Sequence, residues 1–498
     1  MRYISTRGQC EPVTAAEALL TGLAPDGGLY LPASFPAGVA SSFATEPNLT
    51  YQQLANRILT LFLSDYTRTE LEECIRRAYG ENFATPAVTP VTMVSEKLGF
   101  LELWHGPTCA FKDLALQLLP HLLSAAARKL RFDREIVLLV ATSGDTGKAA
   151  LEGFKDVPGT KVIVFYPEDG VSTVQKQQMI TKEGTNTYVV GVTGNFDQAQ
   201  AGVKAVFTNE DFRQEMAAAG KTFSSANSIN WGRLVPQLVY YFKAWSDLCQ
   251  HHTLAPGETF NVVVPTGNFG NILAAYYGKK LGLPLHKLIC ASNRNNVLTE
   301  FIQTGEYNRN RQFYQTLSPS MDILVSSNLE RLLYDLAGAD PALVRAYMEQ
   351  LQQKGYYRLA AEERERLQNE FWAGFADEAE TTAAIRAVYD RYHYLLDPHT
   401  AVGYKVYQDY LEASGDDRPT IIASTASPFK FNQGVAQAVL GPEAEEITDE
   451  FVLMEKLSAV TGVALPRALA GLQDKPIRHR RVIAPAAMAE TVREILGL

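Results

Sequence analysis

The chain has 498 residues, of which 46% are hydrophobic and 20% charged, and its net charge is −9. This length exceeds what one hydrophobic core supports, so we expect two to four domains, and the acidic charge argues against nucleic acid or a membrane surface as a partner. The five cysteines are far apart and form no C-x-x-C pair, so neither a disulfide framework nor a zinc site is expected. Because the first residues lack the apolar stretch of a signal peptide and no apolar run could span a membrane, we expect a soluble cytoplasmic protein.

Residues 1–98 are expected to form an N-terminal domain. A Gly/Pro turn at 24–28 leads into a short strand, and the spacing of the leucines predicts helices at 51–63 and 69–79. The prolines within residues 84–90 disfavour a helix and predict an extended link to the next domain.

Residues 99–305 alternate between short apolar runs and helical patterns. Short apolar strands separated by helices are typical of parallel sheets that are covered on both faces. We therefore predict an α/β core of two lobes, the earlier strands in one and the later strands in the other. The expected strands are 136–141, 161–166, 187–192, 260–264 and 288–291, and helices are expected from 147 and at 172–182, 197–207, 234–249 and 274–281.

The last two segments differ in character. Residues 306–394 are rich in charge and predict a mainly helical insertion, whose charge runs are most simply solvated helix faces. Residues 395–498 contain one further apolar strand at 420–425 and are expected to complete the α/β core.

Lys112 is the candidate catalytic residue. It lies in the stretch 105–113 between two apolar segments, where a Gly-Pro turn gives way to a helical pattern. A lysine that is removed from water has a lowered pKa and becomes an amine nucleophile for a carbonyl group. The alternative is a lysine at a helix start whose stem is packed and whose ammonium group stays in water.

Two strand-to-helix turns, 141–148 and 264–271, are candidate anion-binding sites that bear on the interpretation of Lys112. Backbone N–H groups at such turns can bind an anion, although simple helix capping by Asp145 or Thr146 is the alternative. A P-loop is excluded because Thr142 and Ala149 stand where glycine and Ser/Thr are required, and the second turn lacks a G-x-G-x-x-G fingerprint. A reactive lysine with two anion-binding turns indicates pyridoxal phosphate as the cofactor.

A third polar stretch, 225–233, combines amides and hydroxyls with Arg233 just before a helix. The planar guanidinium suits a phosphate group, and a surface loop with a helix cap is the alternative. The eight histidines form no H-E-x-x-H motif and no Cys/His cluster, so no metal site is expected.

Five motifs in order resemble the threonine synthase family. They are Gly22–Tyr30, His105–Asp113, Thr142–Gly147, Asn227–Trp231 and Gly267–Asn271. The resemblance implies a two-lobed pyridoxal-phosphate fold of the tryptophan-synthase-β type, with a small N-terminal domain and a helical insertion. It also implies conversion of O-phospho-L-homoserine and water to L-threonine and phosphate.

The resemblance also assigns roles. Lys112 would bind the cofactor covalently and then move protons at the substrate, and Thr425 would meet the pyridine nitrogen and leave it uncharged. The cofactor phosphate would lie against Gly267, Asn268, Phe269, Gly270 and Asn271. The substrate carboxylate and the cofactor ring would face Ser143, Gly144, Asp145 and Thr146. The substrate phosphate would lie against Asn227 and Arg233, with Ser228 and Lys148 as further candidates.

The chain departs from the family at two places. Residues 427–431 read Ser-Pro-Phe-Lys-Phe where many members have His-Pro-Ala-Lys-Phe, so no role of that histidine is carried over. Relatives of this fold also often have asparagine where Asp145 stands.

Other functions remain open on this scaffold. A related phospho-lyase would release 2-oxobutanoate, and a serine/threonine dehydratase would need no second phosphate site. A non-catalytic ligand-binding relative would not need an intact Lys112. The sequence leaves a monomer and a homodimer equally open.

Overall fold

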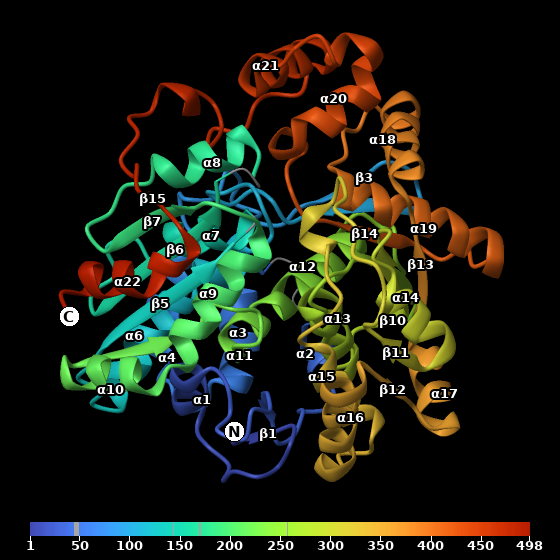
Figure 1. Ribbon diagram of the computed structural model, residues 1–498. Coiled ribbons are helices and arrows are strands. Elements are labelled where there is room, and N and C mark those ends of the chain that lie inside the picture. Colours follow the sequence, from blue (N-terminus) through green and yellow to red (C-terminus); the bar gives the residue numbers. More distant parts are fainter. Residues whose placement is uncertain (44–48, 143, 169–170, 256) are drawn as a thin grey trace.

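The computed structural model describes residues 1–43, 49–142, 144–168, 171–255 and 257–498. Two sheets of largely parallel strands lie side by side, each with helices on both faces, and the N-terminal segment packs beneath them (Figure 1). The prediction of an α/β fold with parallel sheets is confirmed.

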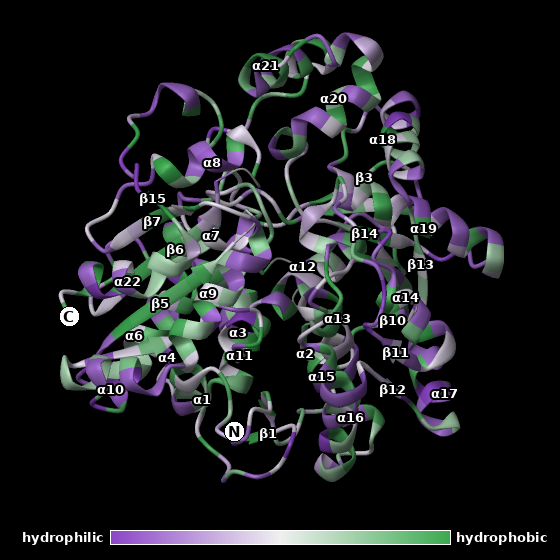
Figure 2. Ribbon diagram, in the orientation of Figure 1, coloured by the Kyte–Doolittle hydropathy of each residue, from purple (hydrophilic) through white to green (hydrophobic). Residues whose placement is uncertain are grey.

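One sheet has five parallel strands in the order β15-β7-β6-β5-β8. Its central strands are apolar almost throughout (Figure 2), and alternate residues face opposite sides, as in any strand. Val137 and Ile163 face α9, α10 and α22, whereas Leu138 and Val162 face the large central core. The strands are β5 (Glu135–Ala141), β6 (Thr160–Pro167), β7 (Thr187–Val192), β8 (Lys221–Ser224) and β15 (Val482–Ile483). The helices around it are α6 (Leu119–Lys129), α7 (Asp145–Gly153), α8 (Thr173–Ile180), α9 (Phe196–Thr208), α10 (Glu210–Ala218) and α22 (Met488–Leu496).

The other sheet has six strands in the order β13-β10-β9-β14-β4-β3, and only the β3–β4 pair is antiparallel. Helices α12 and α13 cover one face, and α18 to α20 cover the other. The strands are β3 (Val91–Met93), β4 (Leu98–Glu102), β9 (Phe260–Pro265), β10 (Leu285–Ser292), β13 (Phe371–Phe375) and β14 (Thr420–Ser424). The helices are α5 (Asp113–Leu116), α11 (Trp231–Leu234), α12 (Gln237–Gln250), α13 (Gly270–Lys280), α14 (Val297–Thr304), α18 (Glu378–Tyr392), α19 (Pro398–Ser414) and α20 (Asn432–Leu440).

The N-terminal segment shares the central core. Thr14, Thr50 and Thr67 each form a capping box that starts a helix, which explains where α1, α3 and α4 begin. The buried hydroxyl of Tyr79 donates to the carbonyl of Leu114 over 2.6 Å and so ties this segment to the start of α5. The elements are β1 (Tyr3–Ser5), α1 (Ala15–Thr21), β2 (Tyr30–Pro32), α2 (Val39–Phe43), α3 (Tyr51–Phe62) and α4 (Arg68–Ala78).

The insertion and the C-terminal region complete the chain. The insertion contains β11 (Glu306–Asn308), η1 (Pro319–Met321), α15 (Leu329–Leu336), α16 (Pro341–Lys354), β12 (Tyr356–Arg358) and α17 (Ala361–Glu370). The C-terminal region adds η2 (Pro428–Phe431), η3 (Gly441–Ala444), α21 (Glu450–Thr461), η4 (Leu472–Asp474) and η5 (Pro485–Ala487).

The sequence did not reveal three features of the sheets. Strand β13 lies within the segment expected to be mainly helical and follows α17 directly, without the Gly or Pro that marks most boundaries. Strand β8 is a short edge strand with little apolar signal. The sheets also exchange strands along the chain, because β3 and β4 join the later strands and β15 joins the earlier ones.

Within the described residues, no helix combines the length and the apolar composition that a membrane span requires. The same residues contain no group of three or more His, Cys, Asp or Glu side chains arranged to hold a metal ion.

Candidate active site

Lys112 lies beside the carboxyl end of β14. The N–H group of Phe111 donates to the carbonyl of Thr425 over 2.8 Å, and that of Ser427 donates to the carbonyl of Cys109 over 3.0 Å. These two bonds bring the segment that carries Lys112 next to Thr425. Ligands of parallel α/β sheets bind at this carboxyl edge of the strands.

A buried turn sets the start of α5 and therefore the position of Lys112. The Asp113 carboxylate accepts hydrogen bonds from the N–H and the hydroxyl of Thr108, each over 2.8 Å. Burial raises the pKa of Asp113 to about 7, and these bonds partly offset the rise. A Cβ atom on Gly106 would lie 2.6 Å from the Asp113 side chain, so only glycine fits there.

The Lys112 amine is nearly removed from solvent, with 13% of its side chain exposed. Burial lowers its pKa to about 8; Asp145 opposes this change, whereas Arg233 and Lys430 add to it. Its Nζ lies 3.3 Å from Ser320 Oγ and 3.8 Å from Asp145 Oδ2. A fraction of the amine is therefore in the neutral form that acts as a nucleophile near neutral pH.

The turn after β5 places Asp145 beside Lys112. The hydroxyl of Thr142 accepts from the N–H groups of Gly144 and Gly147, which closes the turn. Gly144 has φ 155°, and a Cβ atom on it would lie 2.8 Å from Gln175 Oε1. Thr146 is half-buried in the first turn of α7, and Ser143 lies outside the described residues.

Asp145 is the one carboxylate among three ammonium groups. Its Oδ1 lies 2.6 Å from Lys430 Nζ and 3.2 Å from Lys148 Nζ, and Oδ2 faces Lys112. Although burial alone would raise its pKa, these cations hold it well below the ordinary value. Burial and Lys430 hold the pKa of Lys148 well below its ordinary value. Asp145 therefore stays an anion in the site.

The glycine loop after β9 lies against the insertion. A Cβ atom on Gly267 would lie 2.5 Å from the carbonyl oxygen of Ser320 in η1, so glycine permits this contact. Phe269 has φ 62° and packs its ring against Phe371, so its side chain belongs to the core. Asn271 accepts a hydrogen bond from Tyr240 over 2.8 Å, and Asn268 is exposed. The loop thus offers its backbone rather than these side chains.

The third polar stretch reaches the same loop. Ser228 Oγ accepts from Asn328 Nδ2 over 3.1 Å, and Asn328 also donates to the carbonyl of Asn268 over 2.9 Å. Arg233 is 4% exposed, and burial lowers its pKa to about 10. Its Nη1 donates to the carbonyl of Ala226 over 2.6 Å, but no carboxylate pairs with it in the described part of the chain. Asn227 is exposed beside Ser228.

Sequence reasoning missed three polar residues of the site. Ser320 contacts Lys112, and its N–H donates to His399 Nε2 over 3.2 Å. His399 Nδ1 lies 2.7 Å from Asp397 Oδ1. No motif singles out Ser320, since it lies in a short 3-10 turn of the insertion. Asp397 is visible in sequence only as a helix cap before a proline.

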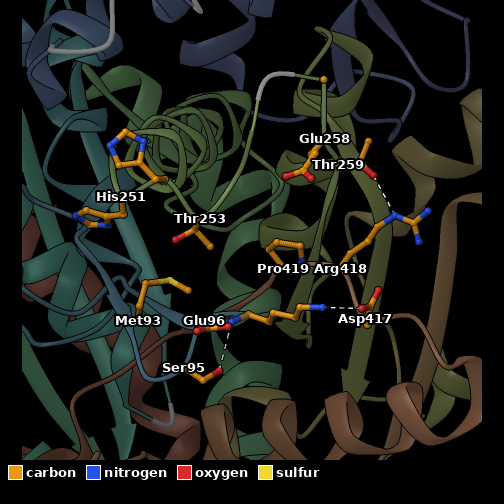
Figure 3. A pocket seen from close by; sticks show the side chains of 13 residues that line it. Met93, Ser95, Glu96, His251, Thr253, Glu258, Thr259, Asp417, Arg418 and Pro419 are labelled. Carbon is orange, nitrogen blue, oxygen red and sulfur yellow. Dashed lines mark hydrogen bonds and ion pairs between the residues drawn. The ribbon is translucent and has the colours of Figure 1, made fainter.

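One surface hollow lies elsewhere. Figure 3 shows it at the amino-terminal ends of β9 and β14, lined among others by Thr259 and Pro419. Lys97 pairs with Asp417 there, and Arg418 donates to Thr259. Because Lys97, Asp417 and Arg418 are partnered and the hollow lies at the edge opposite Lys112, we assign no chemistry to it.

Comparisons with known proteins place this chain in a family. Three family models match in order: "Threonine synthase N terminus" over residues 2–79, "Pyridoxal-phosphate dependent enzyme" over 87–424 and "Threonine synthase, C-terminal" over 400–496. Threonine synthase-like 1 of Homo sapiens is 43% identical over 89% of the chain, and the chain spans 61% of that relative's length. Threonine synthase of Pseudomonas aeruginosa is 37% identical, with 96% of the chain and 98% of the relative covered.

Two solved structures are similar over the whole chain. The structure of PLP-bound threonine synthase from Brucella melitensis has a TM-score of 0.88 at 36% identity and covers 100% of both chains. That of yeast threonine synthase has a TM-score of 0.89 at 33% identity, with 100% of this chain and 99% of the other covered. The chain belongs to the threonine synthase family of pyridoxal-phosphate-dependent enzymes.

Proposed function

We propose that this protein is a threonine synthase, which converts O-phospho-L-homoserine and water to L-threonine and phosphate. The observation that carries the proposal is the presence in one site of a largely buried Lys112, whose pKa is lowered to about 8, and a buried Arg233 that has no carboxylate partner in the described residues. The Lys112 amine suits a cofactor carbonyl, and the Arg233 guanidinium suits an anionic group of the substrate.

The residues of the site fit pyridoxal phosphate. Buried donors without a hydrogen-bond partner in the described part of the chain include Arg233 Nε and Asn271 Nδ2. Unsatisfied buried donors are costly, which favours a polar ligand at this edge. Lys112 would hold the cofactor, the backbone of Gly267–Asn271 would cradle its phosphate, and Thr425 would meet its ring nitrogen.

The bound cofactor would supply an electron sink for carbanion chemistry at the substrate. The chain's own residues move the protons and bind the substrate. Lys112 moves protons at the Cα and Cβ atoms of the substrate, which its pKa of about 8 permits because both protonation states are populated near neutral pH. Asp145 stays ionised beside Lys112 and raises its pKa, so it opposes the loss of the proton that Lys112 must later return.

The substrate has two anionic groups, and the site has two places for them. We assign the departing phosphate to Arg233, with Asn227 and Ser228 as hydrogen-bonding partners and Lys148 as a further cation. We assign the substrate carboxylate and the cofactor ring to Gly144, Asp145 and Thr146 and, from the sequence motif alone, to Ser143. Backbone N–H groups at the start of α7 favour a carboxylate there.

The cellular setting is part of the proposal. All five cysteines have free thiols, which supports a reducing compartment such as the cytoplasm. We keep the domain boundaries at 1–98, 99–305, 306–394 and 395–498, and we propose a monomer or a homodimer.

Product analysis of the purified, cofactor-loaded protein with O-phospho-L-homoserine tests the function. Threonine and phosphate in equal amounts are expected, and Lys112→Ala should abolish turnover and the covalent attachment of the cofactor. Phosphate with 2-oxobutanoate would show a phospho-lyase instead. Loaded protein that releases no phosphate would favour a non-catalytic ligand-binding protein.

A further inference from the structure

Among the described residues, Ser320 is the only one whose side-chain hydroxyl forms a hydrogen bond with the Lys112 amine. The hydroxyl accepts a hydrogen bond from Lys112 Nζ and donates one to Asp145 Oδ2, and both distances are 3.3 Å. Ser320 therefore connects the nucleophilic amine to the one carboxylate of the cluster.

The direction of this chain of hydrogen bonds is fixed. Asp145 is an anion held by Lys148 and Lys430, so it can only accept. The hydroxyl proton of Ser320 must then point at Asp145, which leaves an oxygen lone pair toward Lys112. An N–H bond of Lys112 faces that lone pair, and the nitrogen lone pair of the neutral amine is turned away from Ser320.

A buried pair holds Ser320 in this position. The Ser320 N–H group donates to His399 Nε2, so this nitrogen carries no proton, and Nδ1 carries the proton that it donates to Asp397. His399 is 2% exposed and Asp397 is fully buried. Asp397 caps α19 by accepting from the His399 N–H over 3.0 Å, and Thr400 also donates to it. The ring of His399 is thereby fixed at both nitrogens.

We propose that Ser320 is a catalytic residue that orients the lone pair of the Lys112 amine, and that His399 and Asp397 are positioning residues that fix Ser320. The carbonyl of Ser320 also packs on Gly267, so one short turn of the insertion touches both the lysine and the glycine loop. This inference rests on the proposed function only in its effect on turnover, because attachment of the cofactor to Lys112 needs no substrate.

The first test is the rate at which Lys112 in the full-length apoprotein forms its bond to added pyridoxal phosphate, followed by absorbance. Ser320→Ala should slow this step by about tenfold to a hundredfold, since misoriented groups lose rate on that scale. Ser320→Thr keeps the hydroxyl and should restore the rate to within about threefold. In the loaded enzyme, kcat should fall by a similar factor in Ser320→Ala while KM changes little.

His399 offers a matched pair of variants. In His399→Gln the amide oxygen takes the place of Nε2 and still accepts from Ser320, whereas the shorter His399→Asn leaves that N–H without a partner. We expect His399→Gln to retain the attachment rate and His399→Asn to lose it, with similar melting temperatures for both.

Some results would overturn the proposal. They are a wild-type attachment rate in Ser320→Ala, failure of the threonine variant to restore it, or equal loss in both His399 variants when both remain folded. A slow Ser320→Ala attachment in a protein that does not turn over O-phospho-L-homoserine would leave this inference standing and reject only the proposed function.

Discussion

The two strand-to-helix turns of the site differ in the chemical groups that they present. The loop after β9 has no charged side chain between Thr266 and Asn271 and offers backbone groups. The turn after β5 carries Asp145 and Lys148, which are both buried and surrounded by charges from other elements. A neutral loop binds an anion through backbone geometry, whereas a charged turn controls the protonation of the groups around it.

The largest difference should appear when the charged turn loses its anion. Asp145→Asn leaves Lys112, Lys148 and Lys430 close together without the carboxylate that offsets them. Breaking a buried ion pair costs about 3–5 kcal/mol, so the midpoint of urea denaturation should fall clearly. Asp417→Asn, which breaks the exposed pair with Lys97, is the control and should leave the midpoint unchanged. Equal midpoints for both variants would contradict the charged-turn description.

The neutral loop should instead be sensitive to volume. In Gly267→Ala the new Cβ atom would lie 2.5 Å from the Ser320 carbonyl oxygen, which forces η1 to move. Overpacking of this kind costs about 1–3 kcal/mol, and we expect a lower melting temperature for the protein without added cofactor. Gly270→Ala is the matched variant, since its Cβ atom would have neighbours only at 3.5 Å, an ordinary contact distance. If both variants melt alike, steric fit at Gly267 is not the reason for its glycine.

The charges of the site should also appear in a pH profile. With a pKa of about 8, about a tenth of Lys112 is neutral at pH 7 and about nine tenths at pH 9. The rate of reductive methylation of Lys112 in the apoprotein, followed by peptide mass spectrometry, should therefore rise about tenfold over this range.

Two variants should move that profile in opposite directions. Asp145 raises the pKa of Lys112, so Asp145→Asn should shift the midpoint to lower pH. Arg233 lowers the pKa, so Arg233→Met should shift it to higher pH. A midpoint near pH 10.5 in the wild-type protein would show that the amine is not desolvated.

The smallest effect is expected where the neutral loop loses a side chain. Asn268 is exposed, and its side-chain oxygen accepts a hydrogen bond from the hydroxyl of Ser327 over 3.3 Å. Exposed substitutions of this kind usually change stability by less than about 0.5 kcal/mol. Asn268→Ala should keep both the melting temperature and the affinity for pyridoxal phosphate, as measured by absorbance titration. A large loss of affinity would mean that the loop binds through this side chain.

Local patterns account for what the sequence predicted well. The strands at 187–192 and 260–264 and the helix start at Lys112 follow from apolar runs and turn residues, which are properties of neighbouring residues. The two turns and Lys112 could likewise be found because each motif is continuous in the chain. Strand β13 was missed because it is short and directly follows a charged helix without a turn residue, although its aromatic residues favour a strand; its place at the sheet edge comes from pairing with β10.

The sequence by itself determined the family and the α/β class and singled out Lys112 as the candidate nucleophile, because these depend on short motifs and on periodicity. Only the tertiary structure showed that Lys430, from the C-terminal region, forms an ion pair with Asp145. It also showed that Ser320 contacts the Lys112 amine and that His399 accepts a hydrogen bond from Ser320. Electrostatic and hydrogen-bonding partners act over a few ångströms in space and can be separated by hundreds of residues in sequence. For that reason the candidate nucleophile could be found from the chain alone, whereas the groups around its amine could not.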